Sequence, residues 1–166
     1  MGKKLRIILI DDDLAVLGSL SEALNLHGYP NRKFSDPQEA VELYKWEKFD
    51  VVITDIKMPE MNGIEVLKAV RKHNQDAAVI ILTGYADTNN AITAVNEGAY
   101  AFFHKPPDLK SLLATLSKIE KELLEIQNKE NVEVDLMRLY LEYKDLMNTF
   151  KSRQNTKDGI DESSVG

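Results

Sequence analysis

Six polar residues lie at the ends of short apolar runs of the sequence. Together they could act on a phosphoryl group. They are Asp11, Asp12, Asp13, Asp55, Thr83 and Lys105. Carboxylates gathered at one place repel one another, and a hard divalent cation such as Mg²⁺ relieves that repulsion. Magnesium is commonly held by one or two carboxylates together with phosphate oxygens, so the cluster predicts a phosphoryl ligand. Lys105 could pair with one phosphoryl oxygen, Thr83 could donate to another, and one aspartate could itself be the nucleophile.

Five short apolar runs alternate with stretches of helical periodicity. The runs are 5–10, 31–34, 51–54, 79–82 and 100–103, and the periodic stretches between them are 14–27, 37–46, 62–72 and 87–97. Runs this short, with apolar residues on both faces, are typical of strands buried on both sides. Strict alternation predicts an α/β fold, a doubly wound (βα)₅ parallel sheet. Ligands bind such sheets beyond the carboxyl ends of the strands, where the six polar residues lie.

Some residues of these elements have ordinary structural roles in our interpretation. Asp13 is expected to cap the helix that follows it, and Ser35-Asp36-Pro37 is typical of a helix start. Trp46 is expected to pack at the end of its helix. A further stripe is expected to face the core, namely Leu14, Leu17, Leu20 and Leu24.

Residues 5–120 resemble the receiver domain of bacterial two-component response regulators. The resemblance rests on five motifs in order: Ile8–Asp13, Asp50–Pro59, Met61-Asn62-Gly63, Ile81–Gly84 and His104-Lys105-Pro106. It implies a flavodoxin-like sheet with the strand order 2-1-3-4-5. A member of this family is itself a standard example of that strand order.

The resemblance also implies roles for the acidic residues. Asp55 matches the phosphoacceptor, which receives its phosphoryl group from a sensor histidine kinase or a phosphotransfer protein. Asp12 matches the direct Mg²⁺ ligand and Asp11 the acid that reaches the metal through water, while Asp55 and the backbone carbonyl of Lys57 complete the metal site. Receivers of this family are switches, so we expect no turnover enzyme.

The remaining motif residues match the switch of the family. Lys105 would hold a phosphoryl oxygen, and Thr83 would reorient to bond another. Phe102, three residues before the lysine, matches the aromatic residue that swings inward with Thr83. This movement would alter the surface made by helix 87–97, strand 100–103 and the helix from 109. The resemblance also implies a cis peptide between Lys105 and Pro106.

A stripe of apolar residues continues past the point where a receiver has a sheet to cover. We therefore expect a receiver domain at 1–120, a helical or coiled-coil extension at 121–150 and a disordered tail at 151–166. A parallel homodimer is expected through Ile119, Leu123, Ile126, Leu136, Leu139, Tyr143, Leu146 and Phe150. Ile126 and Leu136 are ten residues apart where the register needs eleven, which predicts either local overwinding or a break into two helices. In the rival interpretation, the second helix folds back on the receiver.

Composition narrows the classes of protein. The 166 residues include 21 basic and 27 acidic side chains, which give a net charge of −6, so we expect no direct nucleic-acid binding. No cysteine is present, which excludes disulfides and thiolate metal sites. The apolar run near the start is too short for a signal peptide or a membrane span, so we expect a cytoplasmic protein. The motif sequences are similar to those of receivers that form the N-terminal regulatory part of longer transcriptional activators.

Two other functions remain open at this point. A haloacid-dehalogenase-like phosphatase would use Asp11 as its nucleophile, and Asp13, Thr83 and Lys105 match parts of its motifs. However, no paired acids follow Lys105 on a strand, as that family requires. A pseudo-receiver would only bind partners, without any Mg²⁺-dependent modification.

Overall fold

A computed structural model describes residues 4–84 and 88–158 of the chain. The chain divides into two compact units, Met1–Glu120 and Lys121–Gly166. The first unit contains the sheet and the polar residues singled out above, and the described part of the second is the later part of one helix.

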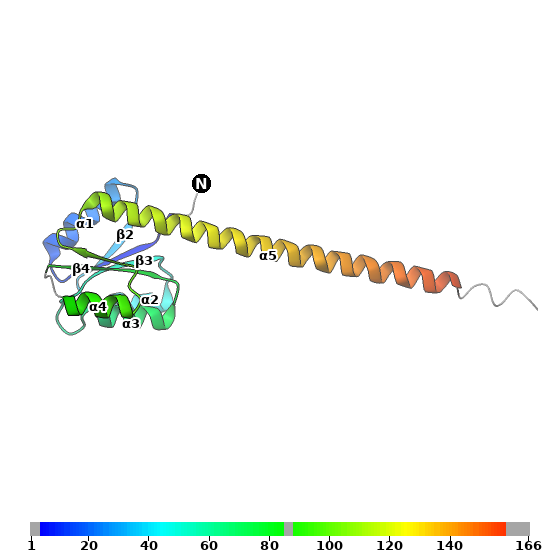
Figure 1. Cartoon of the computed structure of the whole chain (residues 1–166), viewed down its shortest axis with the longest axis horizontal. Coiled ribbons are helices and arrows are strands. Elements are labelled where there is room, and N and C mark those ends of the chain that lie inside the picture. Colours follow the sequence, from blue (N-terminus) through cyan, green and yellow to red (C-terminus); the bar gives the residue numbers. More distant parts are fainter. Residues whose placement is uncertain (1–3, 85–87, 159–166) are drawn as a thin grey trace, which may run out of the picture. The chain divides into compact units, whose positions relative to one another are not determined.

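The first unit is built on a five-stranded parallel sheet (Figure 1). Its strands are β1 (Ile7–Ile10), β2 (Asn31–Phe34), β3 (Val51–Asp55), β4 (Ala78–Thr83) and β5 (Ala101–His104). They lie in the order β2-β1-β3-β4-β5, which confirms the predicted doubly wound topology. Ile10 pairs with Thr54, Asp55 with Leu82, and the last residue of β4 with the last residue of β5. The register therefore brings the carboxyl ends of the central strands to one edge.

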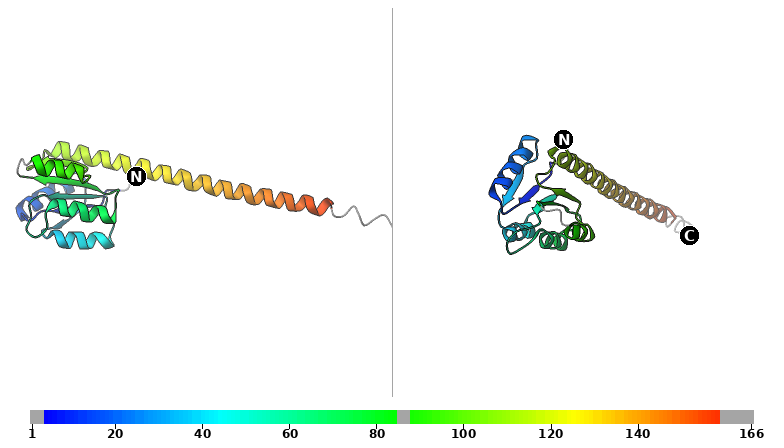
Figure 2. Two further views of the ribbon diagram at one scale, coloured as in Figure 1. Left: turned by 60° about the horizontal axis from the view of Figure 1, so that its bottom comes forward. Right: turned by 60° about the vertical axis from the view of Figure 1, so that its left-hand side comes forward.

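Helices cover both faces of this sheet. They are α1 (Leu14–Leu26), α2 (Pro37–Trp46), α3 (Gly63–His73), α4 (Thr88–Asn96) and α5 (Leu109–Asp158). Within the first unit, α1 and the start of α5 lie on one face, and α2, α3 and α4 lie on the other (Figures 1 and 2). Asp13 and Asp36 cap their helices as predicted, and Asn62 forms a reciprocal capping box with Glu65 at the start of α3.

The core lies between the sheet and its helices, and two expected core residues are missing from it. All residues of β1, β3 and β4 are buried, as predicted for strands covered on both faces. Leu17 and Leu24 of α1 are buried too and Leu20 is half-buried, but Leu14 is 69% exposed and Trp46 is 82% exposed. Leu14 begins its helix and Trp46 ends its helix. Periodicity assigns a residue to a helix face but does not say where along the helix the covered sheet stops.

The start of α5 packs within the first unit. Leu112, Leu116 and Ile119 are buried there, with Ile119 only 3% exposed. The expectation that Ile119 belongs to the dimer stripe was therefore wrong, because its side chain already has a core to pack in. Spacing alone could not separate the two uses, since both parts of the stripe follow the same alternation of three and four residues.

The second unit contains the rest of α5, and this helix does not break. It runs without interruption from Leu109 to Asp158, so the predicted break between Ile126 and Leu136 is absent and there is no separate second helix to fold back. Residues 151–158 are helical, where a disordered tail was expected. Neither glycine nor proline occurs between 109 and 158, so nothing in the local sequence stops the helix before Gly159. The remainder of the expected tail lies outside the described residues.

The second unit leaves its apolar side chains uncovered within the monomer. Every large apolar side chain from Leu124 to Phe150 is between 37% and 68% exposed. None of the helices in residues 4–84 and 88–158 is both long enough and apolar enough to cross a membrane.

Candidate functional site

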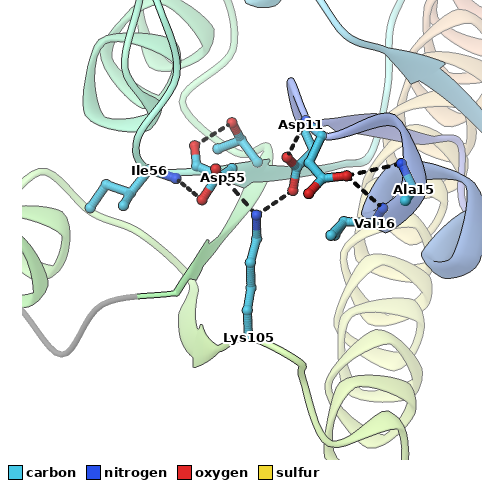
Figure 3. Close-up of polar contacts among 8 residues, drawn as sticks. Asp11, Ala15, Val16, Asp55, Ile56 and Lys105 are labelled. Carbon is cyan, nitrogen blue, oxygen red and sulfur yellow. Dashed lines mark hydrogen bonds and ion pairs between the residues drawn. The ribbon is translucent and has the colours of Figure 1, made fainter.

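Three of the predicted acidic residues meet at the carboxyl edge of the sheet, and Figure 3 shows two of them, Asp11 and Asp55. Asp11 and Asp12 follow β1, and Asp55 is the last residue of β3. One carboxylate oxygen from each lies within 4.8 Å of the others. Asp11 is 4% exposed and Asp55 is 8% exposed, whereas Asp12 is open to solvent. Asp11 and Asp55 are therefore buried, and Asp12 lies on the solvent side of the cluster.

The backbone around Asp55 fixes the orientation of its carboxylate. Asp55 Oδ1 accepts a hydrogen bond from the Ile56 amide at 2.8 Å. The same amide also donates to the Leu82 carbonyl of the neighbouring strand at 3.0 Å. One carboxylate oxygen is therefore engaged with the backbone, and the other faces the cluster.

Gly63, which the sequence marks only as part of the Met61-Asn62-Gly63 motif, lies against the backbone of Asp55. A Cβ atom at residue 63 would stand 2.3 Å from the Asp55 carbonyl oxygen and 2.9 Å from the Ile56 Cα. The Gly63 amide donates to the Ile56 carbonyl at 2.9 Å. Only glycine fits so close an approach, so α3 can begin directly against the residue that the sequence marks as the phosphoacceptor.

Lys105 reaches into the cluster from the end of β5. Its Nζ atom donates to Asp11 Oδ2 and lies 3.2 Å from Asp55 Oδ2 (Figure 3). Its backbone amide donates to the Thr83 carbonyl at 2.7 Å, which ties the lysine to the end of β4. The Lys105–Pro106 peptide is cis, as the resemblance implied. The ammonium group thus lies between two buried carboxylates.

The pKa values of this pair follow from burial and charge. Burial raises the pKa of Asp55, the Lys105 ammonium opposes that rise, and the charge of Asp11 adds to it. Burial would lower the pKa of Lys105, but its hydrogen bond to Asp11 and the charges of Asp11 and Asp55 raise it instead. Lys105 therefore stays protonated, and Asp55 ionises less readily than an exposed aspartate.

The donor set fits a hard divalent cation. Three carboxylates face one ammonium group, so the cluster carries excess negative charge that a cation would relieve. Oxygen ligands of this kind are those that Mg²⁺ prefers, and Asp12 could provide a ligand on the solvent side. Asp13 takes no part, because its side chain caps α1 by accepting from the Ala15 and Val16 amides at 3.0 and 3.2 Å.

The predicted switch residues lie on adjacent strands beside the cluster. Thr83 is buried at the end of β4, where it pairs with His104 of β5. Phe102 is half-buried on β5, packs against the core, and lies with its ring centroid 6.1 Å from that of His104. Lys57 is exposed in the loop after β3. A joint movement of Thr83 and Phe102, and a metal contact from the Lys57 carbonyl, remain predictions.

An open apolar groove of about 550 Å³ adjoins the lysine. Helix α1 forms one wall and the segment from Lys105 to Leu109 forms the other. The lining residues are Ala15, Val16, Ser19, Leu20, Ala23, Lys105, Pro106, Pro107 and Leu109. A side chain or helix seated in this groove would stand next to the acidic cluster.

Comparisons with known proteins agree with this geometry. The chain is 38% identical over 107 residues to the regulatory protein AtoC of Escherichia coli, a match that covers 64% of the chain and 23% of AtoC. It is 34% identical over 117 residues to the transcriptional regulatory protein ZraR of Klebsiella oxytoca, covering 70% of the chain and 26% of ZraR. The chain therefore spans about a quarter of the length of these two relatives.

Solved structures of receiver domains are also similar to this chain. A receiver domain from Clostridium thermocellum superposes with a TM-score of 0.68 at 34% identity, over 72% of this chain and 98% of that one. The beryllofluoride-activated NtrC4 receiver domain dimer superposes with a TM-score of 0.66 at 29% identity, over 70% of this chain and 97% of that one. The family model of the response regulator receiver domain matches residues 7–117, which is more than half of the chain. The chain therefore belongs to the response regulator receiver family, whose domains are signalling switches.

Proposed function

We propose that this chain accepts a phosphoryl group on Asp55, with Mg²⁺ bound by the neighbouring acids, and so acts as a phosphorylation-dependent switch. The observation that carries the proposal is the convergence of Asp55, Asp11 and Lys105 from three strand ends. Asp55 is the acid best placed as nucleophile, because its Oδ1 is engaged by the Ile56 amide while Oδ2 faces the lysine. Bound Mg²⁺ would offset negative charge on the phosphoryl oxygens.

The proposed reaction needs no oxidant and no further co-reactant. A carboxylate oxygen of Asp55 attacks the phosphorus of a phosphohistidine, and the P–O bond of an acyl phosphate forms as the P–N bond breaks. The imidazole nitrogen keeps the bonding electron pair. Lys105 then exchanges its contact with Asp55 Oδ2 for one with a phosphoryl oxygen, and the Thr83 hydroxyl donates to another.

The donor in this proposal is a sensor histidine kinase or a phosphotransfer protein. The apolar groove supports a protein donor, because it offers a docking surface whose lining includes Lys105, the residue that contacts Asp55. A small-molecule donor would need only the acidic cluster and the lysine. The Thr83 and Phe102 positions would then pass the change to the surface formed by α4, β5 and the start of α5.

The second part of the proposal is a parallel homodimer through the later part of α5. Its seven contact residues are Leu123, Ile126, Leu136, Leu139, Tyr143, Leu146 and Phe150. The exposure of this stripe supports self-association, since a long apolar face is unfavourable in water. The similar NtrC4 receiver is described as a dimer. Light scattering on the whole chain at tens of micromolar should give a dimer or a larger assembly, and a monomer would contradict this part.

The relatives suggest where the signal goes. AtoC and ZraR are named as a regulatory protein and a transcriptional regulatory protein, and the chain matches only about a quarter of each. We propose that this receiver and its helix regulate a transcriptional activator, as the N-terminal part of a longer protein. If the phosphorylated chain on its own bound the transcription machinery in a pull-down experiment, that result would argue against this proposal.

The experiment for the phosphoacceptor compares two aspartates. The chain, Asp55→Ala and Asp11→Ala would each be incubated with Mg²⁺ and acetyl phosphate, and the covalent phosphate located by mass spectrometry. We expect labelling at Asp55 in the unchanged chain and none in Asp55→Ala. Labelling at Asp11 that survives Asp55→Ala would instead favour a haloacid-dehalogenase-like phosphatase. A chain that takes no label and does not respond to beryllofluoride would be a pseudo-receiver.

A further inference from the structure

The later part of α5 has more apolar surface than a pair of helices can cover. Its main stripe, which we call the seam, consists of Val132, Leu136, Leu139, Tyr143, Leu146 and Phe150. These residues alternate at spacings of four and three, which is the pattern of the a and d positions of a coiled coil. Tyr140 and Met147 each follow a seam residue directly, are seven residues apart, and occupy the neighbouring e position. We call these two residues the flank row.

The flank row widens the apolar face beyond the width of a simple seam. At about 100° per residue, the arc from Leu146 through the seam to Tyr140 covers roughly 120° of the helix circumference. A face of a and d positions alone is typical of a two-stranded coiled coil, whereas a face that includes the e position is typical of helix bundles. Tyr140 is 57% exposed and Met147 is 37% exposed in the single chain. Two helices joined at the seam would leave this row in water.

Charges on either side of the seam identify copies of the same chain as the partner. Asp135 and Glu142 occupy the g positions on the side opposite the flank row. Lys144 and Lys151 each follow a flank-row residue by four positions, so they lie on the flank-row side. When parallel helices pack side by side, the g side of one meets the e side of the next. Acids of one copy then lie near lysines of its neighbour.

An antiparallel arrangement lacks this complementarity. Antiparallel pairing brings g positions against g positions, so Asp135 and Glu142 of two copies would face each other. Opposed carboxylates repel, and Arg138, whose guanidinium lies 4.0 Å from the Asp135 carboxylate, offsets only part of this repulsion because one cation faces two acids. Glu133 stands seven residues before Tyr140, so the apolar part of the flank row begins only at Tyr140. The wide face therefore favours a parallel bundle over Leu139–Phe150.

We propose that two of the parallel dimers join through Tyr140 and Met147 into a parallel four-helix bundle, so that the chain assembles as a homotetramer. The inference rests on the proposed self-association through α5 but not on the proposed chemistry at Asp55. A third apolar row, Val134, Met137 and Leu141, lies away from the seam and stays on the outside of such a bundle. It supplies a matched control, because its exposure is similar to that of the flank row.

Sedimentation equilibrium of the whole chain over a range of concentrations tests the assembly, with a monomer of 18.8 kDa as the unit. We expect a tetramer that dissociates to dimers on dilution. The double variant Tyr140→Lys, Met147→Lys should lose the tetramer and keep the dimer. Leu139→Lys with Leu146→Lys should give monomers, and Leu141→Lys should behave like the unchanged chain. Lysine is a good helix former, so circular dichroism should report similar helix content in all variants.

Each alternative result overturns the proposal in a distinct way. A chain that stays dimeric at high micromolar concentration refutes the bundle, as does a tetramer that survives the flank-row substitutions. A tetramer lost with Leu141→Lys would assign the contact to the third row instead. A monomer refutes both the bundle and the proposed dimer. Labelling of Asp55 by acetyl phosphate, measured in parallel, reports on the first unit and separates failure of the assembly from failure of the phosphoacceptor.

The absence of cysteine from the sequence allows a test of helix direction. Arg153 occupies the next seam position after Phe150, so Arg153→Cys places a single thiol at the end of the seam. Parallel chains bring two such thiols within disulfide reach, whereas antiparallel chains hold them far apart. Mild oxidation should therefore yield a covalent dimer on non-reducing gels. Failure to cross-link, with assembly intact, would refute the parallel arrangement.

Discussion

The two units of this chain have similar patterns of apolar residues but differ in whether those residues are buried. In Met1–Glu120, the three central strands β1, β3 and β4 bury their apolar residues against the facing sides of the helices of the same unit. In Lys121–Gly166, the large apolar side chains from Leu124 to Phe150 stay between 37% and 68% exposed. The first unit therefore closes its own core, whereas the apolar surface of the second is left exposed in the single chain and would be covered in the proposed assembly.

Helix α5 contains both situations along one continuous element. Leu116 and Leu139 both belong to stripes with spacings of three and four, yet Leu116 is fully buried and Leu139 is 62% exposed. The pattern predicts an apolar face, but it does not show whether the same chain or another one covers it. Substitutions in the two parts of α5 can test whether each face is packed within the chain or between chains.

The largest effect should come from truncating α5 inside the first unit. Leu116→Ala removes a fully buried side chain and should lower the free energy of unfolding by about 2–5 kcal/mol. Leu139→Ala makes the same change on the exposed stripe, so its effect should depend on protein concentration. Urea unfolding at two concentrations measures both. A concentration-independent loss at Leu139 as large as that at Leu116 would contradict the division.

Gly63→Ala should have the next largest effect. The new Cβ would collide with the Asp55 carbonyl oxygen, which it meets at 2.3 Å, so the start of α3 must shift. We expect a loss of about 1–3 kcal/mol in the free energy of unfolding, together with slower labelling of Asp55 by acetyl phosphate. Gly18→Ala is the matched control: no atom lies within 4 Å of its Cβ position, and it should stabilise α1 by up to about 1 kcal/mol.

The free energy of unfolding should depend on pH because the Asp55 carboxylate is buried. Its pKa is raised in the folded protein, so the folded state holds this proton more tightly than the unfolded chain does. Stability from this group is thus present below the ordinary pKa of an aspartate and is lost as pH rises through the raised value. In metal-free buffer, Asp55→Asn should be more stable than the unchanged chain at neutral pH, with the difference disappearing in acid.

Magnesium gives the complementary measurement on the same cluster. Added Mg²⁺ should raise the melting temperature of the unchanged chain at neutral pH, because a ligand that binds only the folded state stabilises it. Asp55→Asn and Asp12→Asn should respond less. An equal response in all three would place the cation elsewhere than the acidic cluster.

The smallest effect is expected at an exposed aromatic residue of the first unit. Trp46 is 82% exposed at the end of α2, so Trp46→Ser should change the free energy of unfolding by no more than about 0.5 kcal/mol. Tyr44→Ser, at a buried position of the same helix, is the destabilising counterpart. A large effect at Trp46 would show that this side chain has a covering partner after all.

The sequence predicted the parts of this molecule that are determined by alternation and by strand ends. Strand order and the meeting of Asp11, Asp12 and Asp55 follow once five strands alternate with helices in the manner of the receiver family. The close approach at Gly63 was not predictable, because a turn glycine and a glycine pressed against backbone look the same in a sequence. Likewise, the one-residue change of register did not predict the extent of α5. The helix continues through it because no helix breaker is present.

The contact between Lys105 and Asp11 joins residues that are 94 positions apart in the chain. During synthesis the acids of β1 and β3 leave the ribosome long before the lysine that lies between them, so the cluster is incomplete until β5 has been added to the sheet. A chain that ends before Lys105 would therefore lack the ammonium group that lies between Asp11 and Asp55. If the proposed chemistry is correct, only a chain whose fifth strand has been made and folded could accept a phosphoryl group.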